Sequence, residues 1–226
     1  MTKSIVLLSG GLDSAVSLAT VHAEGNKILS LFFDYGQKSL EVEKKASKNL
    51  ANFYKTEFKI IKLDWLKEIT NSPLVNIKTS VPDADTYNME DDAVSKNLWI
   101  PNRNGLFVNI AGCYADSFGY DEIVIGANNE EAKSFKDNSQ DFVNAVTNSL
   151  KFSADKNINV ISPLIKMNKS DIILLGKKLN LPFSLIRSCY NNTEYHCGKC
   201  ESCVRLLSAL NKIKDEEIKK MLFEKE

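Results

Sequence analysis

Short apolar runs and amphipathic stretches alternate along most of the chain. Residues 4–8 and 28–33 are nearly unbroken apolar runs, as is typical of parallel strands buried on both faces. Residues 15–23 and 41–53 carry apolar side chains at helical spacing. The alternation predicts an α/β fold built on a mostly parallel, doubly wound sheet.

The alternation resumes after an irregular stretch in the middle of the chain. Residues 71–96 contain Pro73, Pro82 and several aspartates, so we expect little regular structure there and treat the stretch as a candidate lid. Ligands of such sheets gather outside the carboxyl ends of the strands, where polar clusters of this chain also fall. The remaining predicted elements are a strand at 58–63, a helix at 105–118, a strand at 122–125, a helix at 141–150 and a strand at 160–161.

Composition limits the size and the charge of the molecule. With 226 residues and 43% hydrophobic content, the chain suits one α/β domain with a small appendage. The 29 basic and 29 acidic residues cancel, so a small substrate is favoured over direct binding of nucleic acid. No apolar run approaches the roughly 20 residues of a membrane span, and the amino end has no apolar signal region. We therefore expect a cytoplasmic protein without membrane contact.

The stretch 9–14, Ser-Gly-Gly-Leu-Asp-Ser, lies between the first predicted strand and the first predicted helix. Its two glycines leave the backbone bare and permit positive φ in a tight turn. Free amide groups and the positive end of the helix dipole would then receive a pyrophosphate. Ser9 and Ser14 can donate to phosphate oxygens, whereas Asp13 would repel an anion unless it held Mg²⁺ or a sugar hydroxyl.

This loop matches neither of the two commonest nucleotide motifs, because it lacks a Lys-Ser/Thr ending and the G-x-G-x-x-G spacing. It resembles the PP-loop of ATP pyrophosphatases, a family that splits ATP between its α and β phosphates. The resemblance implies transfer of AMP to a substrate oxygen and does not name the substrate. The alternative is an ordinary Gly-Gly turn between a strand and a helix.

Two further polar clusters stand at the ends of predicted elements. Asp34 follows the second strand, where a carboxylate suits a ribose hydroxyl, and Tyr35 offers a stacking face. A plain polar turn explains the same residues. Arg103 opens the central helix, where it would contact a carboxylate or a phosphate unless it is a solvated surface charge.

Lys166 and Lys169 precede the next helical stretch, after the strand at 160–161. Either ammonium could neutralise pyrophosphate as it leaves. Alternatively, both lysines are exposed neighbours of a helix cap.

Four of the five cysteines lie within one short segment: Cys189, Cys197, Cys200 and Cys203. Disulfides are disfavoured in a cytosolic chain, so four close thiolates favour metal coordination. They would fill the tetrahedral sphere of Zn²⁺, which predicts a structural site, although an iron–sulfur cluster shares this ligand set. Cys113 is expected to be packed in the central helix. His196 could compete as a ligand, but four cysteines already suffice.

Five motifs span the chain: the loop at 9–14, Asp34-Tyr35-Gly36-Gln37, Pro101-x-Arg103-Asn104, Pro163-Leu164-Ile165 with Lys169, and Ser188-Cys189-Tyr190. Together they resemble the 7-cyano-7-deazaguanine synthase family, nearly end to end. The resemblance implies that 7-carboxy-7-deazaguanine, ammonia and ATP yield a nitrile precursor of queuosine and archaeosine, with a structural Zn²⁺ held by the cysteines. Adenylation would make a carboxylate oxygen a leaving group for ammonia, and a second adenylation of the amide oxygen would permit dehydration to the nitrile.

The resemblance also implies a domain plan and residue roles. A PP-loop domain of the adenine nucleotide alpha hydrolase-like type is expected at 1–185, with a four-cysteine zinc segment at 186–226 packed on it, and a homodimer is a further expectation. From the chemistry of the residues themselves, and not from the resemblance, we expect catalytic roles for Asp13, for Lys169 as a contact of pyrophosphate and for Arg103 as a contact of the substrate. Binding of ATP with Mg²⁺ is expected at the PP-loop and after the second strand: Leu8, Ser9, Gly10, Gly11, Leu12, Asp13, Ser14, Ala15, Val16, Ser17, Leu18, Asp34 and Tyr35.

Residues 130–139 depart from the family pattern expected after Gly126-x-Asn128. Many relatives carry a Ser-Gly-Tyr-Pro-Asp-Cys-Arg type of loop there, whereas this chain has Glu-Glu-Ala-Lys-Ser-Phe-Lys-Asp-Asn-Ser. A flat purine-like ring at this sheet edge needs an aromatic face and a polar acceptor. Phe135 and Asp137 meet those needs, and with Arg103 and Asn128 they form the expected substrate set. The alternative is a solvated loop with one buried phenylalanine.

Two other functions fit parts of the sequence. A PP-loop enzyme acting on tRNA itself, such as a thiolase, would need a catalytic cysteine pair and a basic groove. A zinc-stabilised module would bind a nucleotide without turning it over.

Overall fold

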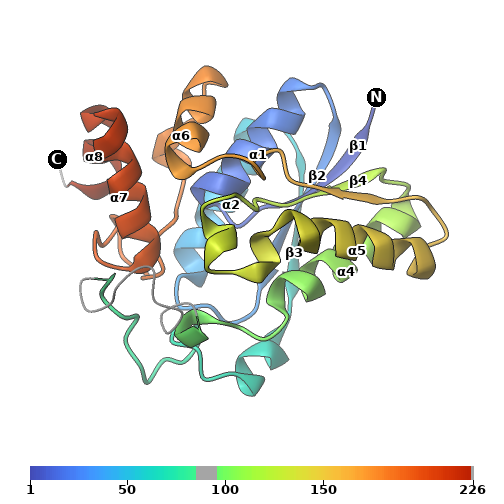
Figure 1. Cartoon of the computed structure of the whole chain (residues 1–226), viewed down its shortest axis with the longest axis horizontal. Helices are drawn as coiled ribbons and strands as arrows, with labels where there is room; N and C mark the ends of the chain where they lie inside the picture. The colour runs from blue at the N-terminus through green and yellow to red at the C-terminus, as the bar shows by residue number, and fades with distance from the viewer. Residues whose placement is uncertain (85–95, 225–226) are drawn as a thin grey trace.

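A parallel sheet forms the centre of the computed structural model (Figure 1), with the strand order β3-β2-β1-β4-β5. The structure describes residues 1–84 and 96–224. All four pairings of neighbouring strands are parallel, and Ile5 of the first strand lies between Leu29 and Ile123. The strands are β1 (Lys3–Leu7), β2 (Lys27–Asp34), β3 (Glu57–Lys62), β4 (Glu122–Val124) and β5 (Asn159–Ile161).

Helices cover both faces of the sheet. Successive residues of the central strands point to opposite sides and are mostly apolar, so each face must be buried under helices. Val6 packs with apolar residues of α1, α2 and α6, whereas Ile5 packs with those of α4 and α5. The expected doubly wound architecture is therefore confirmed. The helices are α1 (Leu12–Ala23), α2 (Leu40–Phe53), α4 (Arg103–Phe118), α5 (Gln140–Ser153), α6 (Lys169–Lys178), α7 (Glu201–Ile213) and α8 (Glu216–Phe223).

The carboxyl-terminal helices α7 and α8 lie beside α6 at one side of the molecule (Figure 1). Leu206, Leu210 and Leu222 belong to the same apolar cluster as Val16 and Ile172. This segment therefore shares its core with the sheet domain. None of the described helices is long and apolar enough to cross a bilayer.

The predicted elements are present with shifted ends. The first helix begins at Leu12 rather than at residue 15, so Asp13 and Ser14 belong to its first turn. The stretch at 71–96 has turns over its first residues, including a bond from the Val75 amide to the Ser72 carbonyl at 3.0 Å. Most of the candidate lid, residues 85–95, lies outside the described residues.

Candidate active site

A cavity of about 250 Å³ opens at the carboxyl ends of β1, β2 and β4. We call it the main cavity. This is the edge at which ligands bind in open parallel sheets, since β1 lies where the strand order reverses. Its wall combines segments from both ends of the chain and includes Ser9, Asp13, Tyr35, Glu43, Arg103 and Ser188.

Gly10 gives the PP-loop its shape. Its φ is +87°, a left-handed conformation, and a Cβ there would lie 2.9 Å from the Cβ of Ala46. The loop is thus pressed against α2, which a side chain at this position would prevent. Hydroxyl groups brace it from the other side, because the Gly11 amide donates to Ser9 Oγ at 3.3 Å and the Leu12 amide donates to Ser188 Oγ at 3.0 Å.

Replacing Gly10 by alanine is expected to lower the free energy of unfolding by about 2–4 kcal/mol. Alanine is strained in a left-handed conformation, and the clash of its Cβ with Ala46 adds a second cost. Gly25→Ala is the matched control: Gly25 has φ +80° but no atom within 4 Å of its added Cβ. Thermal or urea unfolding should rank the two variants, and equal losses would show that the contact with α2 does not matter.

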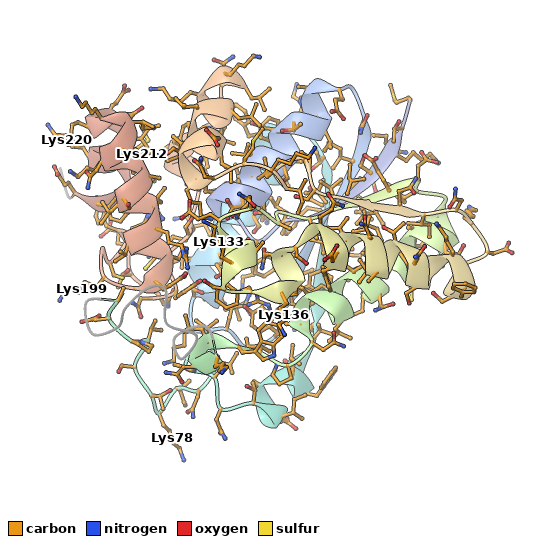
Figure 2. All side chains as sticks on the ribbon, in the orientation of Figure 1. Lys78, Lys133, Lys136, Lys199, Lys212 and Lys220 are labelled. Carbon is orange, nitrogen blue, oxygen red and sulfur yellow. The ribbon has the colours of Figure 1, made fainter. Side chains whose placement is uncertain are left out.

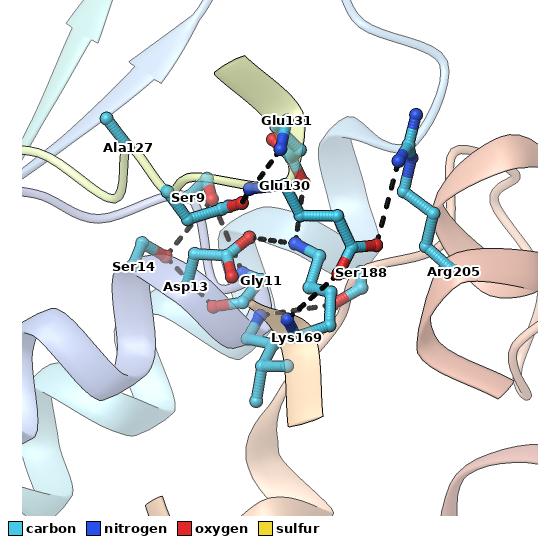
Figure 3. Close-up of polar contacts among 12 residues, drawn as sticks. Ser9, Gly11, Asp13, Ser14, Ala127, Glu130, Glu131, Lys169, Ser188 and Arg205 are labelled. Atoms are coloured by element: carbon cyan, nitrogen blue, oxygen red, sulfur yellow. Dashed lines mark hydrogen bonds and ion pairs between the residues drawn. The ribbon is translucent and has the colours of Figure 1, made fainter. Parts of the chain in front are cut away.

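Asp13 and Lys169 meet across the fold, from the first turns of α1 and α6. The Lys169 side chain is 6% exposed, and its ammonium contacts Asp13 Oδ2 and lies 2.6 Å from Glu131 Oε1 (Figure 3). The chain that follows β4 passes close to the start of α1, since a Cβ on Gly126 would lie 3.0 Å from the Ser14 amide nitrogen. Of the two lysines predicted to neutralise pyrophosphate, Lys169 lies beside the PP-loop, whereas Lys166 is exposed.

Burial and the neighbouring charges shift the pKa values of this cluster. Burial raises the pKa of Asp13 to about 6, although Lys169 partly offsets that effect. Burial opposes the charge of Lys169 as well, yet the two carboxylates outweigh it and raise the lysine pKa above its usual range. Asp13 Oδ1 is buried without a hydrogen-bond partner among the described residues. The cluster therefore keeps a fixed cation beside an unsatisfied carboxylate oxygen.

The predicted nucleotide-binding residues fall into two groups. Those from the loop and the helix start line the main cavity: Leu8, Ser9, Gly11, Leu12, Asp13 and Ser14. Gly10 lies beneath them against α2. Ala15, Val16, Ser17 and Leu18 are buried in the body of α1 and support the loop from behind.

Asp34, the last residue of β2, and Tyr35, which follows it, have different surroundings. Asp34 Oδ1 accepts the Gly36 amide at 3.3 Å, so this carboxylate braces its own turn, outside the lining of the main cavity. Tyr35 lines the cavity and packs at 5.7 Å, centroid to centroid, on the ring of Phe107. Arg103 Nη1 donates to the Tyr35 hydroxyl at 3.3 Å. Arg103 is thus part of the cavity wall and not a solvated surface charge.

A smaller cavity of about 90 Å³, which we call the side cavity, shares Arg103 and Asp137 with the main one. Phe135, Trp99 and Tyr190 supply aromatic groups to its wall. Burial raises the pKa of Asp137, although Arg103 partly offsets that effect. The expected aromatic face and acceptor therefore adjoin the cavity that holds the PP-loop.

Asn128, the fourth expected substrate residue, lies behind these cavities. It is fully buried, and its Oδ1 accepts the amides of Glu130 and Glu131 at 3.1 and 2.9 Å. Asn128 therefore shapes the turn after β4, while its side-chain nitrogen has no hydrogen-bond partner among the described residues.

The four clustered cysteines come together as expected. Their sulfur atoms lie within 4.8 Å of one another, at the start of α7 and in the loop before it: Cys189, Cys197, Cys200 and Cys203. Thiolates at this spacing can hold one metal ion. His196 is turned away from that role, because its Nε2 accepts the Ser188 amide at 3.0 Å and its ring lies on Phe223. Burial lowers the pKa of His196 to about 4, which keeps this acceptor neutral.

The expectation that Cys113 is packed is wrong. Cys113 is exposed, because the buried stripe of α4 runs through Val108, Ala111, Gly112 and Ala115. Its position falls outside this stripe and outside both cavities.

Several residues of the site were not identified from the sequence. Glu43 lines the main cavity, where its carboxylate accepts from Ser39 Oγ at 2.6 Å and from Gln37 Nε2 at 3.1 Å. Burial raises the pKa of Glu43. Glu43 belongs to no recognised motif, and in the sequence it is indistinguishable from the other polar residues of an amphipathic helix. Glu131 lies in the stretch at 130–139, and the departure of that stretch from the family pattern was the one sequence feature that could have pointed to Glu131.

The sheet topology, the PP-loop position and the cavity at the strand ends define an α/β protein of the PP-loop nucleotide-binding class. A 4-thiouridine synthetase solved with RNA and bound ATP has a similar fold, with a TM-score of 0.52 and 18% identity over 97% of this chain and 51% of that chain. A predicted tRNA methyltransferase subunit from Methanocaldococcus jannaschii matches with a TM-score of 0.50 and 17% identity, over 78% of this chain and 75% of that one.

Sequence relatives place the chain within this class. The family model described as queuosine biosynthesis protein QueC matches residues 3–214. The 7-cyano-7-deazaguanine synthase of Pelotomaculum thermopropionicum is 46% identical over 92% of this chain and 96% of its own length. The synthase of that name from Methanosarcina mazei is 42% identical over 93% of this chain and 94% of its own. The chain belongs to the 7-cyano-7-deazaguanine synthase family.

Proposed function

We propose that this protein converts 7-carboxy-7-deazaguanine and ammonia to 7-cyano-7-deazaguanine with the use of ATP. The observation that carries the proposal is the PP-loop at the head of the main cavity, in a chain of the synthase family. A tRNA thiolase would need a catalytic cysteine pair. Four cysteines of this chain form one cluster, and Cys113 lies apart from both cavities.

In this proposal the substrate carboxylate attacks the α phosphate of ATP, and pyrophosphate leaves. Arg103 is placed to hold the carboxylate, because it borders both cavities. Lys169 neutralises the charge that develops on the departing pyrophosphate. Ammonia then replaces AMP to give the amide. The amide oxygen then attacks the α phosphate of a second ATP, with loss of pyrophosphate and one amide proton, and departure of AMP with the remaining amide proton leaves the nitrile.

Asp13 is the residue that would hold Mg²⁺ with the nucleotide. Its Oδ1 is a buried carboxylate oxygen without a partner among the described residues, which fits a hard cation. Bound Mg²⁺ would neutralise phosphate charge. Asp13 itself would fix the ion's position, and its other oxygen orients the Lys169 ammonium.

Zn²⁺ is the metal we propose for the cysteine cluster. Four sulfur ligands with no open position suit a structural tetrahedral site. The ion would tie the loop at Cys189 to the start of α7 and so order a segment at 186–226 on the domain at 1–185. Ammonia as nitrogen donor, a homodimeric assembly and a cytoplasmic location are further parts of this proposal.

The direct test is formation of AMP and the nitrile by the purified protein. Both products should require ATP, the deazapurine acid and an ammonium salt together. Addition of tRNA should change nothing. The absence of AMP above background with all three small substrates present would exclude this function.

Replacing Asp137 by asparagine is expected to weaken binding of the deazaguanine acid by about tenfold or more, because a partly buried acceptor loses its charge. ATP binding should be unaffected. Isothermal titration with each ligand measures both effects, and Asp141→Asn, an exposed change at the start of α5, serves as the control. Unchanged affinity for the acid would move the purine pocket toward Tyr35 and Arg103.

A further inference from the structure

Arg205 of α7 connects the cysteine-bearing segment to the loop after β4. Its side chain is 10% exposed. The guanidinium contacts Glu201 on its own helix and lies 3.4 Å from Ser134 Oγ. It also lies 3.6 Å from Glu130 Oε1 (Figure 3). One planar cation thus holds two segments that lie far apart in the sequence.

The same loop holds the Lys169 cluster on its other side. Glu130 Oε2 accepts the Lys169 backbone amide at 3.1 Å, and Glu131 Oε1 contacts the Lys169 ammonium at 2.6 Å. Glu130 is therefore placed between Arg205 and the start of α6, while its neighbour Glu131 reaches the cation that touches Asp13.

The first residues of this loop are held by Asn128 Oδ1 and by a bond from the Asn129 amide to the Met167 carbonyl at 3.1 Å, whereas the residues after Glu131 have little regular structure. Between the end of β4 and Ser139 it contains two three-residue 3₁₀ helices, Glu131–Lys133 and Lys136–Asn138. Such short helices have few backbone bonds of their own, so contacts to other elements determine where the loop lies. Arg205 supplies a largely buried contact of this kind, and its partner Glu201 also accepts the hydroxyl of Tyr190 at 3.0 Å, on the wall of both cavities.

We propose that Arg205 is a positioning residue for ATP turnover: it holds the loop at 130–134 so that Glu131, Lys169 and Asp13 stand correctly beside the nucleotide. It touches neither cavity itself. The inference rests on the function proposed above and adds that the carboxyl-terminal segment takes part in ordering the ATP site.

Arg205→Met tests the proposal, with Arg205→Lys as the conservative variant and Lys212→Met as the control. Lys212 lies on the same helix and is exposed (Figure 2). Arg205→Met is expected to raise KM for ATP by about 10- to 100-fold in AMP formation, as for other residues that orient a binding group. Arg205→Lys should recover part of this loss, because it keeps the charge and loses the planar fork. Lys212→Met should match the wild type.

A purely structural role would give a different result. Partial unfolding lowers the active fraction and hence kcat, but leaves KM for ATP unchanged. Zinc content and melting temperature of each variant are measured on the same samples. An unchanged KM for ATP in Arg205→Met would overturn the proposal.

Glu130→Gln provides a second route that does not disturb the cysteine segment. Its amide oxygen can still accept from Lys169, but the charge that faces Arg205 is gone. KM for ATP should rise as in Arg205→Met, and the double variant should be no worse than the poorer single one, because both changes break one link. A wild-type KM in Glu130→Gln, or additive effects in the double variant, would contradict the inference even if Arg205→Met fails to fold. An inactive wild type would instead refute the proposed function.

Discussion

Asp13→Asn is expected to abolish most AMP formation, with kcat at least about 100-fold below that of the wild type. The change removes the charge that would hold Mg²⁺ and orient Lys169, while the turn keeps its shape because asparagine has the same size. The adenylation step is measured by the exchange of labelled pyrophosphate into ATP in the presence of the deazapurine acid. Asp155→Asn, at an exposed position beyond α5, is the control.

A measurement of stability should show whether Asp13→Asn loses AMP formation without unfolding. Burial raises the pKa of Asp13 to about 6 in the folded state, whereas the same carboxyl in the unfolded chain has a pKa of about 4. The folded state therefore binds the proton of the Asp13 carboxyl more tightly than the unfolded chain does. The contribution of Asp13 to stability is therefore greatest below about pH 4 and falls as pH rises through about 6. Asp13→Asn should be as stable as the wild type or more stable at neutral pH, and this difference should shrink in acid. Wild-type AMP formation by the variant would refute the assignment.

Cys200→Ser is expected to reduce metal content and to lower the melting temperature by about 10 °C or more, since three thiolates hold Zn²⁺ poorly and the segment depends on it. Cys200 is also the N-cap of α7. Serine is a favourable N-cap residue, so the helix start is retained and the effect reports on the metal. Elemental analysis and thermal unfolding on the same sample check both parts.

Cys113→Ser is the matched control for that experiment. It makes the same atomic change at an exposed position of α4, away from the cluster. It should leave metal content and melting temperature at wild-type values. Full zinc occupancy in Cys200→Ser would rule out a site formed by all four cysteines.

The strands and the PP-loop could be predicted because their signals are local. The apolar run before Ser9 and the helical spacing after Ser14 are readable within a few residues, and the cysteine spacing is equally compact. The prediction that Cys113 is packed was wrong. Apolar residues occur on several sides of α4, so the sequence does not show which side of the helix faces the sheet.

The partners within the site could not be predicted in the same way. Asp13 and Lys169 are 156 positions apart, and nothing in either local sequence specifies that they meet. Glu43 has no local signal either, since its place on the wall of the main cavity depends on how α2 packs against the PP-loop. Such contacts depend on how whole elements pack, which local patterns do not encode.

The contact between the two ends of the chain has a consequence for synthesis on the ribosome. The Arg187 amide donates to the Gly10 carbonyl at 2.6 Å, and Ser188 braces the start of α1. A nascent chain that has emerged through β5 already contains every described strand of the sheet, yet it lacks these braces. Domains fold during synthesis as their residues emerge. We therefore expect the nucleotide loop of such a nascent chain to lack its final shape, and ATP turnover to begin only after residues near 188 have folded back onto the loop.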